Sequence, residues 1–131
     1  MRALLLVDHG SRSPGAHGQL EELARLVEAE LAGAAKEAGA GPVACAHLEL
    51  GEPTVPRAIA ALVAAGARRI VVCPYFLALG RHAGEDLPRL CEAARARHPE
   101  VEILLAEPLG AHPLLARLVL LRAAAADQWT K

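Results

Sequence analysis

Four short apolar runs alternate with segments of helical periodicity along the chain. The runs cover residues 2–7, 43–50, 69–76 and 101–106. A continuous apolar run is typical of a strand that is covered on both faces of a parallel sheet. Parallel neighbours require crossover connections, which are right-handed and usually helical. The alternation therefore predicts an α/β fold with a four-stranded parallel sheet.

Capping residues bound the four expected helices. Serine and threonine cap helix N-termini, proline suits the first turn, and glycine commonly follows the last turn. The expected helices begin at Ser13–Pro14, Thr54, Asp86 and His112–Pro113, and they end near Gly39 and Gly41, Gly66, His98 and Ala126. Asp86 and Pro88 both suit the first turn of the third helix.

The order of the strands follows from how apolar each run is. Runs 2–7 and 69–76 are the most uniformly apolar, so we expect them at the centre of the sheet. Runs 43–50 and 101–106 carry charged or polar side chains, which suit the edges. The result is the order 2-1-3-4 of a small flavodoxin-like, three-layer sandwich, whose topological switch point lies between the first and third strands.

The composition predicts a single cytoplasmic domain over residues 1–131. Hydrophobic residues make up 53 % and aromatic residues 2 %, so the core must consist of Leu, Val, Ile and Ala. A net charge of −1 offers no field that would attract nucleic acid or an anionic membrane. Neither a signal peptide nor an apolar span of about 18 residues is recognisable. The 3 cysteines lie in apolar runs, which predicts reduced thiols.

Two histidines occupy matching places in this pattern. His9 follows the first apolar run, and His82 follows the third, within an expected loop at 77–85. In open α/β sheets, ligands bind beyond the carboxyl ends of the strands, at the switch point. Two imidazoles at one edge indicate metal binding, proton transfer or both.

Polar residues near these histidines are candidates for supporting roles. Ser11, Arg12 and Arg81 offer donors to an anion. Glu49 ends the second run and can reach the edge where His9 emerges. A site made of Cys45, His47 and Glu49 together is not expected, because alternate strand residues would spread over roughly 13 Å. Asp86 could orient His82 or could instead complement a helix dipole.

The last expected helix is apolar on almost every side. A helix that covers one face of a sheet needs only an apolar stripe of roughly 100°. The additional apolar surface of this helix predicts a second partner, most simply another copy of the chain. The apolar positions are Leu114, Leu115, Leu118, Val119, Leu120 and Leu121.

Three sequence blocks form a distinctive set, at residues 8–12 (DHGSR), 48–56 (LELGEPTVP) and 74–88 (PYFLALGRHAGEDLP). At this spacing they strongly resemble the small CbiX-type sirohydrochlorin chelatases, which are class II chelatases related to ferrochelatase. The resemblance extends from residue 1 to about residue 110.

The resemblance implies an ATP-independent lyase that inserts Co²⁺ or Fe²⁺ into sirohydrochlorin for cobalamin or sirohaem synthesis. The divalent metal, Ni²⁺ included, would be a substrate, and no organic cofactor is expected. His9 and His82 would be the catalytic, metal-binding histidines, with Glu49 the best match for a third ligand and Glu52 the next. Ser11, Arg12 and Arg81 would meet the carboxylates of the tetrapyrrole. Larger relatives place the site between two such halves, so the short form is expected to pair as a homodimer.

Of three rival functions, the residues argue against a histidine phosphatase and a flavin module, and a metal carrier is open to test. Histidine phosphatases also carry a His-Gly after a first strand, but with an arginine before the histidine, where this chain has Asp8. A flavodoxin-type flavin module would need a first loop rich in Ser, Thr and Gly and flanking aromatics. A dimeric carrier of divalent metal would need the histidines but no tetrapyrrole.

Overall fold

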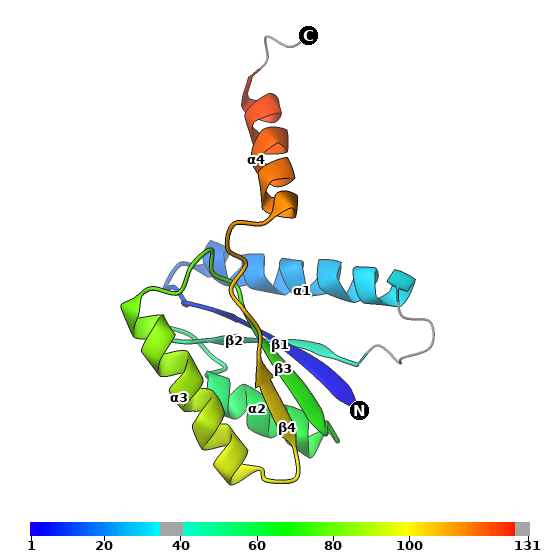
Figure 1. The fold of residues 1–131 in the computed structure, drawn as a ribbon, viewed down its shortest axis with the longest axis vertical. Coiled ribbons are helices and arrows are strands. Elements are labelled where there is room, and N and C mark those ends of the chain that lie inside the picture. The colour runs from blue at the N-terminus through cyan, green and yellow to red at the C-terminus, as the bar shows by residue number, and fades with distance from the viewer. Residues whose placement is uncertain (35–40, 128–131) are drawn as a thin grey trace.

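The computed structural model describes residues 1–34 and 41–127 and has the expected α/β architecture (Figure 1). The four strands are parallel and lie in the order β2-β1-β3-β4, which confirms the predicted topology. The elements are β1 (Arg2–Asp8), α1 (Pro14–Ala34), β2 (Val43–His47), α2 (Val55–Ala64), β3 (Arg69–Pro74), α3 (Arg81–Arg97), β4 (Glu102–Leu105) and α4 (Pro113–Ala126).

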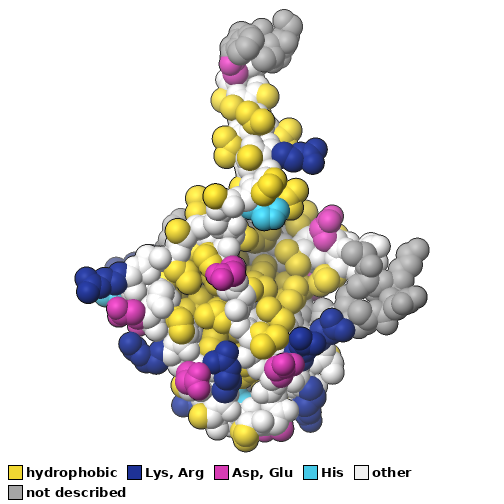
Figure 2. Space-filling model, in the orientation of Figure 1, with side chains coloured by type: hydrophobic (Ala, Val, Ile, Leu, Met, Phe, Trp, Pro, Cys, Tyr) yellow, Lys and Arg dark blue, Asp and Glu magenta, His cyan; other side chains and the backbone are white. Residues whose placement is uncertain are grey.

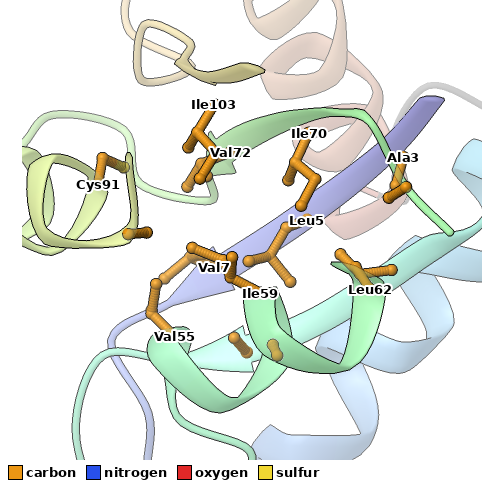
Figure 3. Packing of buried hydrophobic residues seen from close by; sticks show 14 of the residues in the cluster. Ala3, Leu5, Val7, Val55, Ile59, Leu62, Ile70, Val72, Cys91 and Ile103 are labelled. Carbon is orange, nitrogen blue, oxygen red and sulfur yellow. The ribbon is translucent and has the colours of Figure 1, made fainter. Parts of the chain in front are cut away.

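The main core lies between the sheet and helices α2 and α3. Leu5, Ile70 and Val72 point from the strands into this layer and are fully buried. Ile59 of α2 and Cys91 of α3 pack against them, as Figure 3 shows. The core contains no aromatic side chain among these residues, as the composition predicts.

The opposite face of the sheet is covered less completely. Helix α1 packs Leu20 and Ala24 against Leu6 of β1, which forms a second, smaller buried cluster. Towards β3 and β4, alternate residues such as Val71 and Leu104 are only half-buried. Helix α4 buries none of its residues, and it projects away from the sheet instead of completing this layer (Figure 1).

Helix α3 begins earlier than the sequence predicted. Its N-cap is Gly80, and the amide of Gly84 donates to the Gly80 carbonyl at 2.8 Å, so His82 lies in the first helical turn and not in a loop. Pro88, read as a first-turn residue, lies inside the helix. A continuous buried stripe outweighs the backbone hydrogen bond that a proline removes. The stripe consists of Ala83, Leu87, Cys91 and Ala94.

Strand β2 ends earlier than predicted, at His47 instead of residue 50. Leu50 has a φ of +48°, a left-handed conformation that a continuing strand cannot contain. Helix α2 begins as expected, since the hydroxyl of Thr54 accepts a hydrogen bond from the Arg57 amide. The end predicted for the first helix near Gly39 lies outside the described residues. Within the described residues, no helix is both long and apolar enough to cross a membrane.

A candidate metal-binding site at the carboxyl edge of the sheet

The structure places His9 beside Glu49 just beyond the carboxyl ends of β1 and β2. Nε2 of His9 lies 3.5 Å from Oε2 of Glu49, and the two side chains are 56 % and 52 % exposed. Both can therefore reach a ligand in solution. An imidazole nitrogen and a carboxylate oxygen at this spacing can share a divalent cation of the first transition row.

Backbone pairing holds these two side chains together. The amides of Leu48 and Glu49 donate to the carbonyls of Asp8 and His9, both at 2.9 Å, so the pairing of β1 with β2 continues past the two strands. Gly10 makes this approach possible. It has a φ of +96°, and a Cβ at this position would lie 1.7 Å from the Glu49 carbonyl oxygen. No residue with a side chain fits there without moving the backbone.

The segment that follows β3 borders the same site. The amide of Tyr75 donates to the Val7 carbonyl at 2.7 Å, which ties this segment to β1. The next residue, Phe76, packs its ring edge-to-face with the His9 imidazole, with ring centroids 6.2 Å apart. This contact helps to orient the imidazole by ordinary aromatic packing.

His82 is exposed at the start of α3, which follows β3 on the same edge of the sheet (Figure 1). Asp86 pairs with Arg89 at 3.4 Å, so the structure does not support the idea that it orients His82. Glu52 faces Arg57 at 3.8 Å. In residues 1–34 and 41–127, no three His, Cys, Asp or Glu side chains are grouped closely enough to hold a metal ion.

The candidate anion donors lie around this edge. The Ser11 hydroxyl accepts a hydrogen bond from the Ser13 amide at 3.0 Å, which shapes the turn between β1 and α1. Arg12 and Arg81 are exposed, one near each candidate histidine in the sequence.

Cys45 lies apart from the site, because its thiol contacts the Leu20 carbonyl. Burial raises the pKa of the Cys45 thiol, which suits a packing role.

A buried pair of side chains that was not predicted from the sequence lies next to His9. Nδ1 of His47 lies 2.5 Å from Oδ1 of Asp8, with the two residues opposite each other in the β1–β2 register. Asp8 directly follows the first predicted strand, and His47 lies within the second. The pair can be recognised only once the strand register is known, because the register determines which residues of two neighbouring strands lie opposite each other.

Residues 3–126 match the family model described as CbiX. The chain belongs to the CbiX family. It is 34% identical, over 94% of its length, to the sirohydrochlorin cobaltochelatase of Methanocaldococcus jannaschii, and it spans 98% of that protein. It is 36% identical, over 88% of its length, to the chloroplastic sirohydrochlorin ferrochelatase of Arabidopsis thaliana.

Solved structures share the fold. The sirohydrochlorin chelatase SirB of Bacillus subtilis subspecies spizizenii, in complex with cobalt, superposes with a TM-score of 0.80 at 30% identity over 93% of this chain. A putative cobalamin biosynthesis CbiX protein from Marinobacter aquaeolei gives a TM-score of 0.75 at 29% identity, with 97% of this chain and 100% of that one covered. The chain spans about half of the larger relatives, 48% of the Arabidopsis protein and 49% of SirB.

Replacement of Gly10 tests the close approach of the two segments. Gly10→Ala should lower the free energy of unfolding by more than about 1 kcal/mol, since its φ is positive and its Cβ collides with backbone. The matched control is Gly18→Ala in α1, where a Cβ meets nothing within 4 Å. This control should raise the free energy of unfolding by about 0.4–1 kcal/mol. Urea unfolding measures both, and a Gly10→Ala variant as stable as the parent would contradict the geometry.

Proposed function

We propose that this CbiX-family chain is a metal chelatase that inserts Co²⁺ or Fe²⁺ into sirohydrochlorin. The observation that carries the proposal is the exposed His9–Glu49 pair, 3.5 Å apart, at the edge of the sheet where α3 presents His82. Relatives that match most of this chain are named for this reaction with either metal. The metal ion is thus a substrate.

The chemistry of insertion matches these residue types. The ion must be held by a few ligands and released to the four pyrrole nitrogens, and two pyrrole protons must leave. Neutral imidazole binds Fe²⁺ and Co²⁺ and can also accept a proton near neutral pH. We assign His9, His82 and Glu49 as the metal-binding groups, with the two histidines as the catalytic proton acceptors. Since the described residues do not group His82 with His9 and Glu49 closely enough to share one ion, we propose that His82 approaches the pair when the metal binds.

The peripheral carboxylates of sirohydrochlorin need cationic and hydrogen-bonding partners. Arg12 and Arg81 are exposed and have the guanidinium geometry that matches a carboxylate. Ser11 lies between His9 and Arg12 in the turn after β1. We assign these three residues to substrate binding, so that the macrocycle lies with its pyrrole nitrogens towards His9. Three free cysteines in the described chain suit a cytoplasmic location, which we also expect.

Removal of either histidine should abolish most of the insertion activity. His9→Ala and His82→Ala should each lower the rate of Co²⁺ insertion by about a hundredfold or more, since each loses a metal ligand and a proton acceptor. Absorbance of the tetrapyrrole follows the reaction. The control is His98→Ala at the C-terminus of α3, away from the site, which should keep the parent rate. Parent rates in both His9→Ala and His82→Ala would refute the assignment.

One further measurement separates the chelatase from a metal carrier. A chelatase binds sirohydrochlorin without metal and perturbs its spectrum, whereas a carrier leaves the spectrum of the tetrapyrrole unchanged. The names of the relatives favour the chelatase.

We further propose that the active form pairs two CbiX halves, most simply two copies of this chain. The support is α4, which buries none of its residues and exposes Leu114, Leu120 and Leu121 by 67–68 %. Figure 2 shows hydrophobic side chains along α4 and on the body below its base. An exposed apolar surface of this kind on a monomer marks an interface.

The same chain also carries an apolar surface that α4 can cover. A groove of about 780 Å³ runs between α1, the end of β3 and the base of α4. It adjoins the part of the sheet that α1 leaves half-buried. In a twofold dimer, the α4 of each copy can cover the groove of the other copy. Both apolar surfaces are then buried. The residues that line the groove include Leu6, Leu23, Leu26, Val27, Cys73 and Tyr75.

A charge placed on α4 should prevent this pairing. Leu120→Glu puts a carboxylate at the centre of the proposed interface, so sedimentation velocity should show a single chain where the parent shows two. Ala93→Glu introduces the same charge on the exposed surface of α3 and should leave the pair intact. If the parent sediments as a single chain at micromolar concentration, the pairing proposal is wrong.

A further inference from the structure

Among the described residues, His47 is the one polar or charged residue that is buried, at 5% exposure. Its Nδ1 lies 2.5 Å from Oδ1 of Asp8, whose own side chain is only 18 % exposed. A carboxylate accepts hydrogen bonds, so Asp8 favours the tautomer with the proton on Nδ1. A buried imidazole needs a hydrogen-bond partner of this kind. The two residues therefore form a unit.

This unit lies directly behind the candidate metal-binding pair. Asp8 and His47 are the last residues of β1 and β2 and are register partners. His9 follows Asp8 immediately, and Glu49 follows His47 by two positions. The contact between these two side chains thus lies at the last residue pair of β1 and β2, just before the two exposed ligands emerge.

His47 also anchors the loop that carries Glu49. Its amide donates to the Pro53 carbonyl at 2.9 Å, and it forms an isolated bridge with Thr54 at the start of α2. The loop over residues 48–53 therefore leaves the strand at His47 and returns to it. The position of Glu49 depends on how firmly His47 is held.

We propose that His47 is a positioning residue that acts through Asp8 to fix the separation of His9 and Glu49, and thereby the affinity for the metal substrate. The inference rests on the proposed chelatase function. A neighbouring group that holds a metal ligand in place usually contributes to affinity without touching the ion. The hydrogen bond from Nδ1 to Asp8 is the feature that the role requires.

A merely structural role makes a different prediction. If His47 only stabilised the fold, its replacement would lower the free energy of unfolding and leave the affinity of the folded protein for metal unchanged. Three substitutions separate the two roles. His47→Asn keeps an amide donor near the place of Nδ1, His47→Gln moves the donor further out, and His47→Phe removes it while keeping the ring.

The test measures Co²⁺ in two ways, by its KM and kcat in the insertion reaction and by its Kd without sirohydrochlorin, from the visible absorption of the bound cobalt. His47→Gln and His47→Phe should raise KM and Kd by about tenfold, with kcat nearly unchanged. His47→Asn should stay within about threefold of the parent, since the bond to Asp8 remains. The matched control is Cys45→Ala, on the same strand and the same face, which should change neither constant.

Each result decides the matter. Parent-like constants in His47→Gln overturn the inference, and so does an equal loss in all four variants, which would indicate general loosening of β2. If His47→Phe does not fold, the KM and Kd of His47→Asn and His47→Gln are sufficient for the test, because both side chains are polar and of similar size. A parent that binds Co²⁺ without inserting it refutes the chelatase function alone, and the Kd values still judge His47. A parent that does not bind Co²⁺ refutes both.

Discussion

The pairing of β1 between β2 and β3 is the constraint on which the site depends. Because all strands are parallel, the chain leaves β1, β2 and β3 at the same edge of the sheet. Residues that are far apart in the sequence are thereby brought to one place. His9 contacts both Glu49 and Phe76 for this reason, and each of the three belongs to a segment that leaves a different strand.

Hydrophobic patterning was sufficient to predict most of the fold. Runs of apolar residues identified all four strands, and their polarity gave the order 2-1-3-4, since a central strand is buried on both faces. Patterning failed where tertiary packing overrides local signals. Pro88 suggested a helix start, but the buried stripe from Ala83 to Ala94 extends α3 past it. Helix α4 formed as predicted but does not lie on the sheet of its own chain.

The site was only partly readable from the sequence. His9 and Glu49 could be placed at one edge, because strand ends are visible in the sequence. The Asp8–His47 pair could not be predicted, because which residues lie opposite each other on two strands depends on the register and not on position along the chain. The metal-binding roles of His9, His82 and Glu49 remain a proposal that the CbiX resemblance motivates and the geometry at His9 supports.

In the proposed reaction, the carboxyl edge formed by β1, β2 and β3 binds the metal substrate. The most direct measurement is a crystal structure of the chain with Co²⁺, with the ion located by anomalous scattering at the cobalt edge. We expect a cobalt peak at about 2.0–2.2 Å, an ordinary coordination distance, from Nε2 of His9, with Glu49 and His82 as further ligands. Cobalt bound elsewhere, with His9 and His82 both uncoordinated, would contradict the proposal.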